Sequence, residues 1–180
     1  MYFNKLSEWP SSKILKRIII LAIILLLIVY PIMTYFFMIS DFPVGFIQSQ
    51  LSFSGEILKL YYSATDINLY LIGQLLDYGF MLGYGLIFFS VSVLIARIFE
   101  QESKAKQIGL IIVLLGIAAA LFDALENVFI LITLADPFGF PNIIAIIHSL
   151  FALFKYICFI LVLGYIIIAA IAQLIQLIKK

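Results

Sequence analysis

Residues 18–40 read IIILAIILLLIVYPIMTYFFMIS, a run of 23 residues without a single charge. A bilayer core about 30 Å thick needs about 20 helical residues to cross it, so this run is long enough to span a membrane. It is too long for the apolar region of a secretory signal, and it ends in bulky side chains rather than the small ones of a cleavage site. We therefore expect an uncleaved membrane anchor.

Three further segments of the sequence reach the same length. They cover about residues 66–98, 108–135 and 142–178, and they leave an outer loop at 41–65. The chain is 65% hydrophobic and 12% charged, whereas a soluble domain is nearer half apolar and a quarter charged. The sequence predicts an all-α fold in which residues 1–180 form one antiparallel four-helix transmembrane bundle.

Basic residues gather at one end of the predicted helices. Of the 11 Lys and Arg residues, all but Lys59 and Lys155 lie before the first segment, around the second loop or at the end of the chain. They are Lys5, Lys13, Lys16, Arg17, Arg97, Lys104, Lys106, Lys179 and Lys180. Because cytoplasmic loops carry an excess of Lys and Arg, we expect a multi-pass protein of the cell membrane with both termini in the cytoplasm.

The outer loop has the pattern of one short helix at residues 55–62. Ser54 precedes it as an N-cap, and Leu58 and Tyr62 belong to an apolar side. Tyrosines favour the membrane–water interface, so we expect an extracytoplasmic helix that lies flat on the outer surface. A lid over the mouth of the bundle is the alternative interpretation.

Five ionisable residues lie within the apolar segments: Asp77, Asp123, Glu126, His148 and Lys155. A charge at the centre of a spanning helix costs roughly 2.5–3.5 kcal/mol, so such a residue marks a functional site by default. A rise of about 1.5 Å per helical residue, counted from the charged helix ends, places all five in the outer half of the membrane.

Helical spacing indicates that these side chains face one interior. Small residues accompany the polar ones on the third segment, as they do on the packed faces of membrane helices. The polar cluster that we predict comprises Gln74, Asp77, Tyr84, Asp123, Glu126, Asn127, His148 and Lys155.

The cluster admits a structural and a functional interpretation. In the structural one, Lys155 pairs with Asp123 or Glu126 and fixes the helix register. In the functional one, three carboxylates against one lysine leave an excess of acid, so either a carboxyl is protonated or a cation fills the gap. Carboxylates and imidazole suit a divalent metal, but the sequence lacks the spacings of a metal site, so we expect no metal and no cofactor.

The run Phe122-Asp123-Ala124-Leu125-Glu126-Asn127 precedes an apolar stretch, a proline-containing loop and a lysine in the last segment. In this order the chain resembles uncharacterised four-span prokaryotic integral membrane proteins with an Asp-x-x-Glu-Asn helix motif. The resemblance covers most of the chain. It implies the four-span topology and no particular activity.

From these residues we expect an outward-facing polar pocket that binds a lipid-like or amphipathic small molecule, with aromatic walls from Tyr70, Tyr84 and Tyr156. Enzymatic turnover there, with a carboxylic acid as proton donor, is an open alternative. The other alternative is a structural or accessory membrane subunit whose cluster holds the bundle together, in a homo-oligomer or beside a membrane protein partner. The sequence has no basic stripe with interleaved aromatics, so we expect no nucleic-acid partner.

Overall fold

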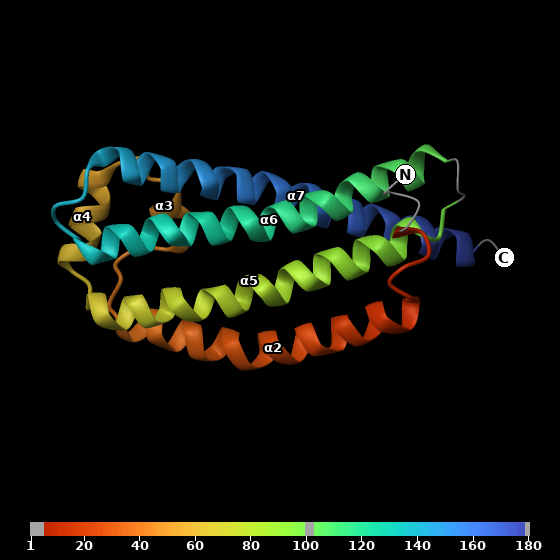
Figure 1. The fold of residues 1–180 in the computed structure, drawn as a ribbon, viewed down its shortest axis with the longest axis horizontal. Coiled ribbons are helices and arrows are strands. Elements are labelled where there is room, and N and C mark those ends of the chain that lie inside the picture. The colour runs from red at the N-terminus through yellow and green to blue at the C-terminus, as the bar shows by residue number, and fades with distance from the viewer. Residues whose placement is uncertain (1–5, 100–102, 179–180) are drawn as a thin grey trace.

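The computed structural model describes residues 6–99 and 103–178, which form six helices and no strand. Four helices are long: α2 (Ser12–Ile39), α5 (Ile67–Ala96), α6 (Lys104–Ala135) and α7 (Asn142–Ile178). They run alternately up and down in chain order (Figure 1), which confirms the all-α four-helix bundle. Lys5, Lys179, Lys180 and the turn residues 100–102 lie outside the described part of the chain.

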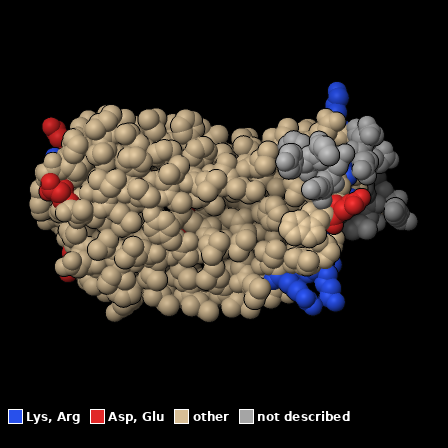
Figure 2. Space-filling view, in the orientation of Figure 1, with Lys and Arg blue, Asp and Glu red and all other residues tan. Residues whose placement is uncertain are grey.

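Each long helix has an apolar stretch of sufficient length to cross a membrane. Large apolar side chains cover the outside of the bundle; Leu27, for example, is 70% exposed and Ile160 is 69% exposed. Figure 2 shows charged side chains at the two ends of the molecule and none along the middle of this face. An apolar surface of this extent is favourable in contact with lipid tails and unfavourable in contact with water. The four helices therefore fit a multi-pass membrane protein.

The long helices begin at polar caps that lie outside the apolar runs. Ser11 Oγ accepts a hydrogen bond from the Ile14 N–H at 3.3 Å, and Asp66 Oδ1 accepts one from the Leu69 N–H at 3.1 Å. Ser103 Oγ accepts one from the Lys106 N–H at 3.2 Å. The first and third helices therefore start at residues 12 and 104, before the predicted 18 and 108, because a helix continues past the apolar run as far as its cap.

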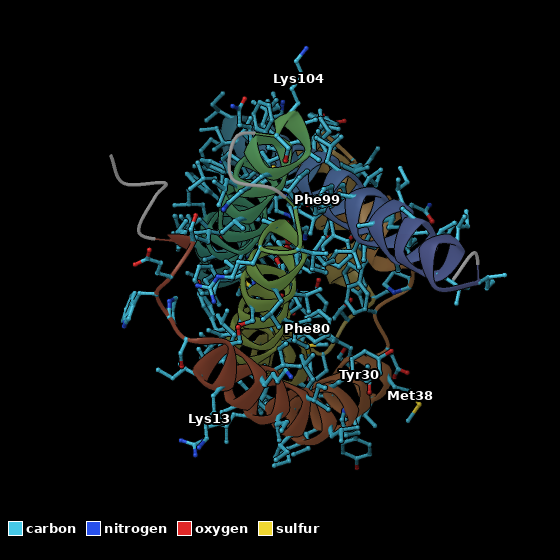
Figure 3. The ribbon with its side chains drawn as sticks, turned by 90° about the vertical axis from the view of Figure 1, so that its right-hand side faces the viewer. Lys13, Tyr30, Met38, Phe80, Phe99 and Lys104 are labelled. Carbon is cyan, nitrogen blue, oxygen red and sulfur yellow. The ribbon has the colours of Figure 1, made fainter. Side chains whose placement is uncertain are left out.

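The four helices form an open, curved layer. α2 packs along α5, α5 along α6 and α6 along α7, while α2 and α7 do not pack along each other. Figure 3, a view close to the bundle axis, shows α2 and α7 separated on one side of α5. Glycines bring the packed pairs together: Gly83 faces Leu26 of α2, and Gly109 of α6 faces Ala96 of α5.

The predicted short helix is present as α4 (Gly55–Ser63), capped by Ser54 Oγ, which accepts from the Ile57 N–H at 3.4 Å. α4 does not lie apart from the bundle, because it packs against α7 and buries Leu58 and Tyr62. The Tyr62 hydroxyl lies 2.8 Å from Thr133 Oγ1 of α6. Burial raises the pKa of Tyr62 to about 12, against the lowering effect of this hydrogen bond, so the phenol stays protonated at neutral pH.

A second short helix, α3 (Phe46–Gln50), was not predicted from the sequence. It lies at the same end of the bundle as α4 and the α6–α7 turn (Figure 1), and we call this the α3/α4 end. The chain leaves α3 through Phe53, which has a φ of 51° and donates its N–H to Ser149 Oγ of α7 at 3.0 Å. This anchor holds α3 against α7.

The packing of α5 on α6 can be tested at Gly109. A methyl group there would come within 2.7 Å of Ala96 Cβ and 2.5 Å of the Tyr165 hydroxyl oxygen. Overpacking of this kind costs about 1–3 kcal/mol, so Gly109→Ala should unfold at a lower temperature than the wild type. The matched control is Gly164→Ala, since a Cβ at Gly164 meets nothing within 4 Å.

Cys158 supplies the measurement, because it is the only cysteine and is buried. A thiol-reactive maleimide dye should label Cys158 only as the bundle opens on heating. Equal labelling midpoints for Gly109→Ala and Gly164→Ala would show that the predicted α5–α6 contact is absent.

Candidate functional site

The polar cluster centres on the ammonium group of Lys155, which is 6% exposed. Its Nζ lies 3.0 Å from Asp123 Oδ1, 2.5 Å from Glu126 Oε2 and 3.2 Å from Gln50 Oε1. The sequence predicted a contact with either carboxylate, and the structure shows contacts with both. The ammonium group donates hydrogen bonds to Asp123 and Gln50 and forms an ion pair with Glu126, so three oxygen atoms surround it.

Helix geometry explains how the two carboxylates reach one lysine. Asp123 and Glu126 are three residues apart on α6, which places both on the same face of the helix. That face is turned towards α7, along which α6 packs, and Lys155 lies on α7 opposite them. Asp123 and Glu126 are 4% and 0% exposed, so neither charge is accessible to lipid.

Gln50 is the site residue that the sequence analysis missed. Its side-chain carbonyl accepts hydrogen bonds from Lys155 and from the Tyr156 hydroxyl, and it is 7% exposed. The signal in the sequence is weak: a polar run of Gln48, Ser49 and Gln50 within a loop that otherwise looks superficial. Only the fold brings α3 back over the bundle.

Two further side chains extend the cluster towards α5. The Tyr84 hydroxyl donates to Asp123 Oδ2 at 2.8 Å and lies 3.2 Å from the Ala119 carbonyl oxygen. Asn127 Nδ2 donates to Asp77 Oδ2 at 2.7 Å. Within the described residues no basic side chain pairs with Asp77. Asp77 is therefore the carboxyl of the cluster that forms no ion pair within the described part of the chain.

His148 lies at the edge of the cluster. It is 2% exposed, and its Nε2 is 3.6 Å from Glu126 Oε1, which is too long for a hydrogen bond. Neither ring nitrogen has a hydrogen-bond partner among the described residues. The position is two turns from Lys155 towards the α3/α4 end, as the sequence predicted from its spacing.

A cavity of about 270 Å³ adjoins the cluster. Its polar wall consists of Gln50, Gln74, Asp77, Tyr84, Asp123, Lys155 and Tyr156, and its apolar wall of Tyr30, Met33, Thr34, Phe37, Phe46, Phe80 and Phe159. The side chains come from α2, α3, α5, α6 and α7. A cavity thus lies where the predicted polar residues meet.

Four residues expected at the cavity are not in its lining. Glu126 and Asn127 lie behind the cavity wall. Glu126 binds Lys155 and Asn127 binds Asp77, and these two partners line the cavity. His148 lies beyond Glu126. The prediction that Tyr70 forms part of the cavity wall was wrong. Its ring stacks on that of Phe42 in the hydrophobic core of the α3/α4 end, with ring centroids 4.5 Å apart.

The cavity is lined by both α2 and α7, the two helices that do not pack along each other. At the α3/α4 end its lining includes Phe46 and Gln50 of α3 and no residue of α4, the helix that the alternative interpretation made a lid. In Figure 3, Tyr30 of α2 and Phe80 of α5 lie on the side where α2 and α7 diverge. The cavity therefore lies on that side of the bundle.

Within residues 6–99 and 103–178, no group of three or more His, Cys, Asp or Glu side chains has the arrangement of a metal site. No protein-family model, curated protein or solved structure matches the chain. The cluster and its cavity are therefore the basis on which a function is inferred.

Replacing Lys155 tests the ion pairs of the cluster directly. Lys155→Met leaves two buried carboxylates without their cation, and breaking a buried pair in this way costs about 3–5 kcal/mol. We expect a large fall in the labelling midpoint of Cys158 for this variant. The triple variant Lys155→Met, Asp123→Asn, Glu126→Gln removes all three charges and should recover most of the loss. A neutral effect of Lys155→Met alone would mean that the lysine reaches the membrane surface instead.

Proposed function

We propose that the protein binds an amphipathic small molecule or lipid in the cavity between α2 and α7. The single observation that carries this proposal is a cavity with one polar wall inside a bundle of otherwise apolar helices. Ligand pockets are mostly apolar with a few convergent polar groups, which is the composition found here.

The size and the opening of the cavity support an amphipathic ligand. Pockets for drug-sized molecules have volumes of about 300–1,000 Å³, so about 270 Å³ suits a polar headgroup and the first part of a chain. The remainder of a chain would leave through the gap between α2 and α7 and lie among lipid tails. A membrane lipid or a lipid-like compound has this shape, whereas a fully polar solute would have to cross lipid to enter.

The charge distribution supports an orientation with the α3/α4 end outside. Lys13, Lys16, Arg17 and Arg97 lie at the end of the bundle opposite α3 and α4, where α2 begins and α5 ends in Figure 1. Cytoplasmic loops are rich in such residues. We propose a multi-pass protein of the cell membrane with cytoplasmic termini, in which the cavity lies in the outer half of the bilayer.

The three oxygen contacts of Lys155 favour a second, structural role for part of the cluster. With three oxygen partners from α3 and α6, this ammonium group cross-links three elements of the fold. Such a pair specifies the register of helices more than it adds stability. The structural role thus concerns Lys155, Asp123 and Glu126, and ligand binding concerns the cavity beside them.

Filling the cavity should abolish binding. Thr34 lines the cavity, and its hydroxyl bonds only to carbonyls of its own helix, at 2.8 Å from the Tyr30 oxygen. In Thr34→Trp the indole would occupy the space of the ligand without leaving a buried partner unpaired. Native mass spectrometry of the purified protein should show a bound amphiphile in the wild type and little in Thr34→Trp.

The control for this experiment is Ile32→Trp, on the same helix but 43% exposed and outside the cavity lining. It should retain the bound mass. If the wild-type protein carries no amphiphile, or if Thr34→Trp carries as much as Ile32→Trp, the proposed function is wrong.

The orientation can be tested by cysteine labelling in a Cys158→Ala background. Ala64 at the α3/α4 end and Ser12 at the opposite end are both exposed. A membrane-impermeant maleimide should label Ala64→Cys in intact cells and Ser12→Cys only after permeabilisation. The reverse pattern would invert the topology.

A further inference from the structure

From the geometry of the cavity we infer that its ligand carries a protonated amine, whose N–H groups bind Asp77 and Gln74. This inference rests on the proposed function and names the chemical class of the headgroup. Lys155 would be the obvious partner of an acidic headgroup, but it already has two hydrogen bonds, to Asp123 and Gln50, and an ion pair with Glu126. An anionic ligand would therefore have to displace a carboxylate from this residue.

The acceptors of the cavity, by contrast, are incompletely used. Gln74 is 2% exposed and lines the cavity, and its Oε1 has no hydrogen-bond partner among the described residues. Leaving a buried acceptor unpaired is unfavourable, so a donor from a ligand would be favourable there. Asp77, three residues further along α5 and on the same face, accepts from Asn127 and forms no ion pair with a described basic side chain.

The net charge of the cluster points to the same class of ligand. When all three carboxyl groups are ionised, Asp77, Asp123 and Glu126 against Lys155 give −2 with a neutral His148 and −1 with a protonated one. Both values are negative, and a cation in the cavity would bring the sum closer to zero. A buried charge that lacks a partner is costly, so this balance favours a ligand of +1.

Aromatic rings next to these acceptors suit a cation as well. Tyr30, Phe80, Tyr84 and Phe159 all line the cavity, and successive ring centroids are 5.8, 5.6 and 5.3 Å apart. An ammonium group over such faces is attracted by the negative charge of the ring faces, more strongly where water is excluded. The same rings would pack on the methylene groups next to the nitrogen.

The test compares three single-chain probes with the same dodecyl tail: dodecylammonium, dodecanol and laurate. Each is titrated into the purified protein in detergent, and the labelling midpoint of Cys158 on heating reports binding, because a ligand that binds the folded state raises it. We expect dodecylammonium to raise the midpoint at about one tenth of the mole fraction needed for dodecanol, with no specific effect of laurate.

The deciding variant is Asp77→Asn, which keeps an oxygen for the amide of Asn127 and removes the charge. It should need about tenfold more dodecylammonium for the same shift, with an unchanged response to dodecanol. Asp66→Asn is the matched control, because the same change is made at an exposed helix cap away from the cavity. Should Asp77→Asn fail to fold, Gln74→Met tests the second acceptor and should weaken the response to dodecylammonium alone.

The outcomes separate this inference from the proposed function. If dodecanol or laurate acts as strongly as dodecylammonium and Thr34→Trp abolishes the effect, the cavity binds amphiphiles but the amine inference is wrong. An equal response of Asp77→Asn and Asp66→Asn to dodecylammonium would also overturn the amine inference. If Thr34→Trp changes the response to none of the probes, the proposed function fails with it.

Discussion

Much of this fold depends on the burial of a single ammonium group, that of Lys155. Lys155 lies within an apolar helix, where a lone charge is unfavourable by several kcal/mol, so the chain must supply oxygen atoms to it. Two come from α6 through Asp123 and Glu126, and one comes from α3 through Gln50. The contacts of this one side chain thereby determine which face of α6 packs against α7, and they hold the loop helix α3 against the bundle. Tyr84 joins α5 to the same group through Asp123.

The second constraint is the open arrangement of the helices. Because α2 packs along α5 and not along α7, the bundle has one side on which two helices diverge. In water such an opening would expose apolar surface, but lipid tails can fill it at little cost, since they are as apolar as the side chains around them. The divergence of α2 and α7 is thus compatible with stability in a membrane. Gln74 and Asp77 lie on that wall, and Lys155 has its charge already matched.

Much of this arrangement was predictable from the residues. The four long helices follow from segment length and hydropathy, and α4 follows from Ser54 and the apolar residues after it. The contact of Lys155 with the carboxylates of α6 follows from their depth and spacing. Three features did not follow. The role of Gln50 and the existence of α3 depend on how the loop folds back, and the position of Tyr70 depends on Phe42, another loop residue. Loops carry no periodicity from which such contacts could be read.

The sequence by itself therefore determined the helices, their lengths and which of their faces are polar, because a membrane demands long apolar segments and penalises each charge within them. The tertiary structure alone decided which partners each polar group has. Counting along the helices places Asp77, Asp123, Glu126 and Lys155 at one depth. Only the packing surrounds the lysine with three oxygens and leaves Asp77 without an ion pair among the described residues. It also decided that α2 and α7, which both line the cavity, do not pack along each other. The physical reason is that hydrophobic burial specifies which face of a helix turns inward, whereas the neighbour that this face meets is set by the fit of glycines and side chains between helices.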